Sequence, residues 1–144
     1  MSFILKILSM FLLLLLGCSS QEKNIYIESP DKSISVKVLK RNNDFIYNVN
    51  FNGKTIIQDS KVGLMFKNNF EFPTNHNVKK VEKGFHKNTW ELPWGEKKVV
   101  KDIYNEIIIS LTDTNNLETG KMLFRAYDDG IAFRYQMNDN NKNQ

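Results

Sequence analysis

The sequence predicts an all-β fold, an antiparallel β-sandwich, and three features support this prediction. Apolar and polar residues alternate over most of the chain after residue 24, and no stretch there has the spacing of an amphipathic helix. The pair Asn52-Gly53 separates two alternating runs, which is the strongest local signal for a two-residue hairpin. A second tight turn is expected at Asp128-Asp129-Gly130. The 144 residues are enough for one domain and too few for two.

The expected elements follow one another along the chain after a turn at 30–32. The strands are predicted at 34–38, 45–51, 54–57, 63–66, 78–85, 99–112, 121–127 and 131–137. Two apolar rows at every second position are expected to face a core: Phe45, Tyr47, Val49 and Phe51 in one strand, and Ile107, Ile109 and Leu111 in another. We therefore place the β-sandwich at 25–137 and expect the polar tail 138–144 to be disordered.

The first 18 residues have the pattern of an export signal. Lys6 precedes an apolar run over 7–16 that only Ser9 interrupts. Ten helical residues span about 15 Å, half of a bilayer's hydrocarbon core. The run is therefore too short for a transmembrane helix and has the size of the apolar region of a signal peptide.

This run ends in Leu15-Leu16-Gly17-Cys18, which resembles a bacterial lipobox. The resemblance implies cleavage before Cys18 and a lipid on its sulfur, with each buried CH₂ adding roughly 0.8 kcal/mol to anchoring. We expect a lipoprotein signal peptide at 1–17, then the lipidated cysteine and a tether at 18–24. Serine at position 19 implies, by analogy with Gram-negative sorting, the outer membrane, on its periplasmic or surface face. The alternatives are an ordinary signal peptide that ends in cysteine and a buried core cysteine.

Composition excludes several other classes of protein. A single cysteine gives no intramolecular disulfide framework, and with two histidines it does not assemble a Cys/His zinc site. The net charge of +4 comes without any long basic run, because no basic run exceeds two residues, as at Lys79-Lys80 and Lys97-Lys98. Together with export to a membrane, this argues against a nucleic-acid partner.

Three passages carry more than a generic strand pattern. They read SPDK at 29–32, followed by the strand to residue 38, then WELPWGEKKVVKDIYNE at 90–106 and FRAYDDGIAFRY at 124–135. Together they resemble the N-terminal domain of glycoside hydrolase family 97, the bacterial α-glucosidases and α-galactosidases, over about residues 25–135. The resemblance implies that the chain forms part of a mutarotase-like β-supersandwich.

The chain also departs from this family pattern. In the family the domain is longer than this chain, and a catalytic (β/α)₈ barrel follows it. The resemblance implies that the paired catalytic carboxylates, and the glutamates that hold a calcium ion, lie beyond the position matching Gln144. We therefore expect no catalytic residue, metal or other cofactor in this chain, with calcium only in the full-length enzyme. With only part of the strands present, one of the two apolar rows is expected to lack its opposing sheet.

Several residues within 90–106 are candidates for contact with a carbohydrate. Trp90, Trp94 and Glu96 could form a stacking platform with a carboxylate that accepts a hydroxyl, although Pro93 disfavours a regular strand there. Core or interface aromatics are the plainer interpretation. Further candidates are Tyr104, Asn105 and Glu106, for which a structural polar network is the alternative.

The remaining charged residues favour structural roles. We expect Arg125 and Arg134 to pair with Glu106 or with the aspartates of the 128–129 turn rather than to clamp an anion. Adjacent aspartates in one tight turn are too few ligands for calcium. His76 and His86 have polar neighbours in the sequence and are expected at the surface, outside any cluster.

The leading functional hypothesis is a non-catalytic, carbohydrate-associated N-terminal fragment of a lipid-anchored family 97-type glycoside hydrolase. Its partners would be the membrane through Cys18, an α-linked oligosaccharide, and a catalytic barrel if one is encoded downstream. The alternative is an independent small surface lipoprotein that binds a glycan or protein partner through an open β-sheet. A third possibility is a truncated gene product without a function of its own.

Overall fold

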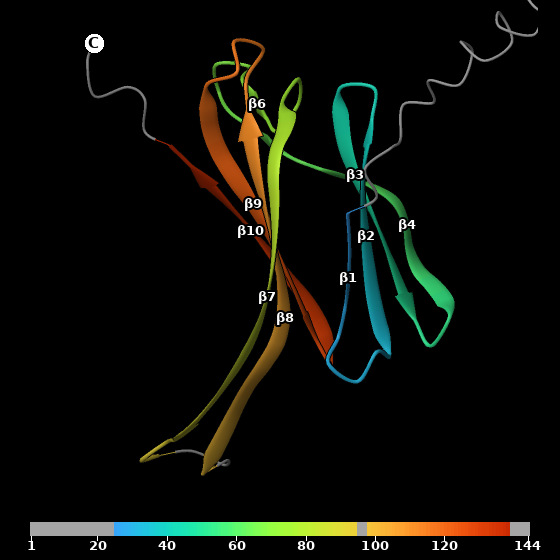
Figure 1. The fold of residues 1–144 in the computed structure, drawn as a ribbon, viewed down its shortest axis with the longest axis vertical. Helices are drawn as coiled ribbons and strands as arrows, with labels where there is room; N and C mark the ends of the chain where they lie inside the picture. Colours follow the sequence, from blue (N-terminus) through green and yellow to red (C-terminus); the bar gives the residue numbers. More distant parts are fainter. Residues whose placement is uncertain (1–24, 95–97, 139–144) are drawn as a thin grey trace, which may run out of the picture.

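A computed structural model describes residues 25–94 and 98–138 and shows the predicted all-β class. Two four-stranded antiparallel sheets, in the orders β1-β2-β3-β4 and β10-β9-β8-β7, pack face to face (Figure 1). The predicted signal peptide, Cys18, the tether, Glu96 and the tail after Asn138 lie outside the described residues. Within the described ranges, no helix has the length and hydropathy needed to cross a bilayer.

The first sheet is a meander of consecutive strands. Its members are β1 (Ile25–Glu28), β2 (Ile34–Arg41), β3 (Asp44–Phe51) and β4 (Lys54–Val62). The hairpin between β3 and β4 turns at Asn52 and Gly53, whose φ angles of 48° and 79° are the positive values that a type I′ turn needs. The hairpin prediction is therefore confirmed.

The second sheet is also a meander, reached through a short two-stranded ribbon. That ribbon is β5 (Leu64–Met65) with β6 (Glu71–Phe72), and the sheet is β7 (Asn77–Glu91), β8 (Val99–Thr112), β9 (Glu118–Tyr127) and β10 (Gly130–Met137). The main difference from prediction is that β7 continues to Glu91 instead of ending at residue 85. Its pairing with β8 runs without a break from Lys80 to Glu91, so Pro93 follows the strand and does not interrupt it.

The core lies between the two sheets and includes both predicted apolar rows. Phe45 and Val49 of β3 are buried in the same cluster as Ile107, Ile109 and Leu111 of β8. The expectation that one row lacks its opposing sheet is therefore wrong, because the strands divide four and four and the two rows share one core. Phe51, at the end of its row, is exposed, because it is the last residue of β3 and lies next to the Asn52-Gly53 turn, beyond the part of the strand that the second sheet covers.

The far half of the β7–β8 hairpin extends beyond the sandwich. Strand β9 pairs with β8 only from Asn105 onward, so residues 86–91 and 99–104 pair with each other alone. Figure 1 shows this part curving away from the first sheet. We call residues 86–91 and 99–104 the projecting ribbon. Isolated two-stranded ribbons are marginally stable in water, so this one depends on the sheet from which it extends.

Two of the passages that carry the family resemblance meet at one end of the sandwich. The backbone N–H of Asp31, in the turn before β2, donates to Asp128 Oδ1 in the turn before β10, at 2.9 Å. The Asp31 carboxylate accepts hydrogen bonds from the Ser29 hydroxyl and from the N–H and hydroxyl of Ser33, which lower its pKa to about 2. The conspicuous aspartates of both motifs thus hold turns and join the two sheets.

Candidate functional site

The two tryptophans lie on and beyond the projecting ribbon. The Trp90 side chain belongs to β7 and is 42% exposed, on the face that points away from the first sheet. Trp94 follows the strand and is 86% exposed. Glu96 lies outside the described residues. The indoles are therefore open to solvent, which contradicts the core interpretation and leaves a contact role available.

The other predicted carbohydrate contacts divide between the two faces of β8. Tyr104 and Glu106 point to the outer face of the second sheet, whereas Asn105 points to the inner face. There the amide of Asn105 donates from Nδ2 to the backbone oxygen of Glu28 in β1, at 2.8 Å. The predicted residues therefore do not form a single site.

An aromatic and charged cluster surrounds Tyr104 on the outer face. The Tyr104 ring stacks on His86 with centroids 4.8 Å apart and lies 5.0 Å from the ring of Tyr127. The Arg125 guanidinium lies 4.3 Å above the same ring, and its Nε donates to Glu106 Oε2 at 2.7 Å. We call these five residues the Tyr104 cluster. The other four residues of the cluster surround Tyr104, which is only 5% exposed.

The electrostatics of the Tyr104 cluster favour a fixed structural arrangement. The hydrogen bond to Glu106 raises the pKa of Arg125, and burial raises the pKa of Tyr104, so both stay protonated at neutral pH. The predicted Arg125–Glu106 pair is confirmed. The expectation that His86 belongs to no cluster is wrong, since it also lies 3.5 Å from Asp102, Nε2 to Oδ2. The cross-strand pairing of His86 with Tyr104 could have been found only if β7 had been predicted to its full length.

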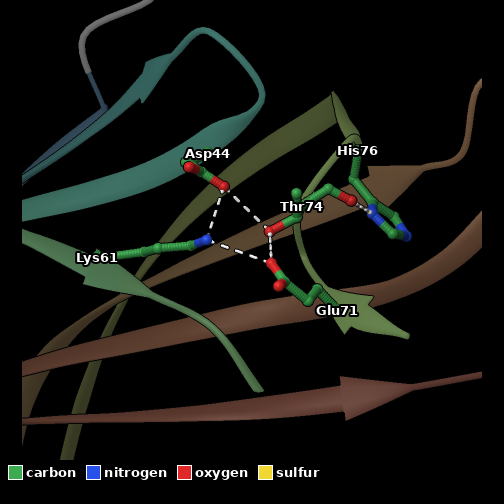
Figure 2. Close-up of polar contacts among 5 residues, drawn as sticks. All are labelled: Asp44, Lys61, Glu71, Thr74 and His76. Atoms are coloured by element: carbon green, nitrogen blue, oxygen red, sulfur yellow. Dashed lines mark hydrogen bonds and ion pairs between the residues drawn. The ribbon is translucent and has the colours of Figure 1, made fainter. Parts of the chain in front are cut away.

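A second polar network joins β3, β4, β6 and the loop after β6 (Figure 2). Lys61 Nζ lies 3.1 Å from Asp44 Oδ1 and 3.2 Å from Glu71 Oε2, and the Thr74 hydroxyl contacts both carboxylates. His76 Nδ1 lies 2.8 Å from the Thr74 backbone oxygen, and its ring contacts Phe72 edge-on. The prediction of a surface His76 is wrong, because its side chain packs under this loop and is 5% exposed.

This network has two carboxylates but not the electrostatics of a glycosidase pair. A general acid in such a pair needs a raised pKa. Instead, the hydrogen bonds from Lys61 and Thr74 lower the pKa of Asp44, and the bonds to Asp44 and Glu71 raise that of Lys61. Both acidic partners thus face the same ammonium group. The arrangement ties β3 and β4 to the segment that leads to the second sheet, and the lowered pKa of Asp44 is the opposite of what a general acid needs.

Comparison with known proteins identifies relatives of this fold. The family model described as glycosyl-hydrolase 97 N-terminal matches residues 27–144. A variant of a glycoside hydrolase family 97 enzyme from Pseudoalteromonas sp. strain K8 in complex with panose is 28% identical, with a TM-score of 0.71 over 78% of this chain and 17% of that chain. The enzyme in complex with acarbose gives the same values. A β-arabinopyranosidase at 21% identity and a TM-score of 0.67, over 77% of this chain and 18% of that chain, shares the fold.

The similarity to the family 97 enzyme extends over most of this chain but over a small part of the enzyme. It includes nearly all of the described residues, yet this chain spans only 17% of the length of the Pseudoalteromonas enzyme. The family model, the antiparallel sandwich and the motif-bearing turns agree with one another. The chain therefore belongs to the glycosyl-hydrolase 97 N-terminal family.

Proposed function

We propose that this chain is a non-catalytic, carbohydrate-associated N-terminal domain of a lipid-anchored family 97-type glycoside hydrolase. The observation that carries the proposal is the projecting ribbon, which holds Trp90 exposed on a β-strand in a chain of this family. An indole can stack on the C–H face of a sugar ring, and its fixed position on a strand lowers the entropy lost on binding. In the whole enzyme, a downstream barrel would supply the catalytic carboxylates and the calcium ion.

The carboxylates in the described part of the chain support the non-catalytic half of this proposal. Glu106 accepts a hydrogen bond from Arg125. Asp44 and Glu71 both form ion pairs with Lys61. The carboxylate of Asp31 accepts hydrogen bonds from the serines of its own turn. The partners of Asp44 and Asp31 lower the pKa of these two carboxyls, whereas hydrolysis of a glycosidic bond also requires a protonated acid. Binding without turnover is the behaviour that this arrangement supports.

The sugar-binding half is tested by calorimetric titration of this 144-residue chain by itself, lipidated and solubilised in detergent, with panose. We expect weak binding without release of glucose, and we expect Trp90→Ala to raise the Kd by about 2- to 10-fold through loss of one stacking contact. Phe51→Ala, which removes another exposed ring from the first sheet, is the matched control and should leave the Kd unchanged. Reproducible hydrolysis, or an absence of binding by the unmodified protein, would refute the proposal.

Membrane anchoring is the second part of the proposal and depends on Cys18. Because this is the only cysteine of the chain and ends the lipobox-like run, Cys18→Ser should abolish incorporation of labelled palmitate. The protein should then move from the membrane fraction to the soluble fraction after the signal peptide is removed. Ser20→Ala, two residues further on, serves as the control. If the Cys18→Ser protein is still labelled and still sediments with membranes, the lipoprotein hypothesis is wrong.

A further inference from the structure

The inner face of the β7–β8 hairpin carries a group of lysines where the core ends. This face is marked by Val81 and Ile109, which pair across the two strands and belong to the core packing. The register is unbroken from Lys80 to Glu91, so every second side chain of β7 and its partner in β8 share the face. The members beyond the core include Lys83, Phe85, Lys87 and Thr89 from β7 and Lys101 from β8. We call these five residues the lysine face.

Charges of opposite sign separate between the two faces of this hairpin. Over residues 82–91 and 99–106, all the lysines lie on the inner face. Three of the four acidic residues in these ranges lie on the outer face, at Glu82, Asp102 and Glu106. The fourth is Glu91, at the far end of β7, and Glu28 of β1 lies near the base of the lysine face. The lysine face therefore has an excess of positive charge, although the hairpin as a whole carries both signs.

The ammonium groups of the lysine face are available to a ligand. Its three lysines are exposed, and within residues 25–94 and 98–138 no carboxylate lies at ion-pair distance from them. By contrast, Lys79 and Lys80 of the same strand pair with Glu118 and Glu82. Like charges on one surface repel one another, so a ligand with several negative charges would relieve this repulsion.

The spacing of the lysine face fits an extended ligand better than a small anion. A strand rises about 3.4 Å per residue, so Lys83 and Lys87 are separated by about 14 Å along β7, with Phe85 between them. Lys101 pairs with Thr89 and is therefore a diagonal neighbour of Lys87. The Phe85 ring is 63% exposed and offers an apolar surface to the C–H face of a sugar. A chain of sugars with acidic groups can contact the ring and the lysines together.

We propose that the lysine face binds an acidic polysaccharide, with its ammonium groups against sulfates or carboxylates and Phe85 against a sugar ring. The inference rests on the proposed carbohydrate association and names the charge class of the glycan. It concerns the face of β7 opposite Trp90. A single-stranded nucleic acid fits less well, because stacking of successive bases needs several aromatic rings and the lysine face has one.

Two polymers with the same glucose backbone, dextran sulfate and neutral dextran, test the inference. Each is titrated calorimetrically into the lipidated 144-residue chain in non-ionic detergent. We expect saturable binding of dextran sulfate that weakens as the salt concentration rises. Neutral dextran should bind about 3- to 100-fold more weakly, since three exposed charge contacts are lost.

Single substitutions assign the binding to this face. Lys87→Gln and Lys101→Gln should each raise the Kd for dextran sulfate by about 2- to 5-fold. Phe85→Ala should raise it by about 2- to 10-fold through loss of the ring contact. The matched control is Lys54→Gln, which removes the same charge from an exposed position of β4 in the other sheet and should leave the Kd unchanged.

The contrary outcomes separate this inference from the proposed function. Absence of dextran sulfate binding, equal binding of the two dextrans, or an equal effect of Lys54→Gln would each overturn the lysine face. The panose titration of the Trp90→Ala variant would still decide the proposed function, because it uses a neutral sugar and the other face of β7. Equal or tighter binding of an oligothymidylate would overturn the assignment to a polysaccharide and identify a general polyanion site.

Discussion

Replacing Phe124 with alanine should lower the free energy of unfolding by about 3–5 kcal/mol. This ring is fully buried at the centre of β9 and contacts Tyr47 of the first sheet and Phe133 of β10, with centroids 6.2 and 5.6 Å apart. Its removal leaves a cavity between the sheets that neighbouring strands cannot close. Since small domains are stable by about 5–15 kcal/mol, most of the stability would be lost.

Urea denaturation followed by far-ultraviolet circular dichroism measures this loss. Phe51→Ala is the matched control, because the same side chain is removed from an exposed position of β3. We expect the control to change the free energy of unfolding by less than about 0.5 kcal/mol. Equal midpoints for the two variants would show that the two sheets do not share the core described above.

Two glycines in strands should respond to the same substitution with opposite signs. A Cβ at Gly120 would lie 2.5 Å from the Gln136 backbone oxygen and 3.0 Å from Met137 Cα, a clash with the backbone of β10. Gly120→Ala is therefore expected to destabilise the protein by about 1–3 kcal/mol, since only movement of a strand relieves the overlap. A Cβ at Gly84 would meet nothing within 4 Å. Gly84→Ala should stabilise the protein by about 0.5–1 kcal/mol, because alanine loses less conformational entropy on folding.

The same urea titration measures both glycine variants. Amide NMR adds a spatial control, since the Gly120 substitution should shift signals along β10 while leaving the β1–β4 sheet unchanged. If Gly120→Ala proves as stable as the unmodified protein, the close β9–β10 approach at this position is wrong.

Local signals in the sequence were sufficient for most strands. The Asn52-Gly53 turn and the alternation in β8 and β9 each depend on neighbours within a few residues, so both could be predicted. The far part of β7 could not, because His86 to Glu91 shows little apolar alternation and is a strand only through its pairing with β8. Tertiary pairing, not local pattern, decides such a segment.

The candidate site was predicted less completely, for a geometric reason. Tyr104 and Asn105 were grouped because they are adjacent in the sequence, yet consecutive residues of a strand point to opposite faces. Alternation alone separates them, but their partners depend on the packing of the two sheets. His76 shows a related limit, because it is buried by the way its own loop folds back against the ring of Phe72, which the alternation of residues does not predict.

The meander order of the two sheets has a consequence for synthesis of the protein. The last strand of the first sheet ends at Val62. The strands that cover its apolar face, β8 and β9, are complete only at Tyr127. At 5–20 residues per second, ribosomes need roughly 3–13 s to make this interval. During this interval the apolar face of the first sheet, with Ile25, Val36 and Phe45, has no covering strands. Asn105, which donates to the edge of β1, is synthesised in the second half of the same interval. The nascent chain thus passes through a period in which binding by a chaperone or export factor competes with self-association.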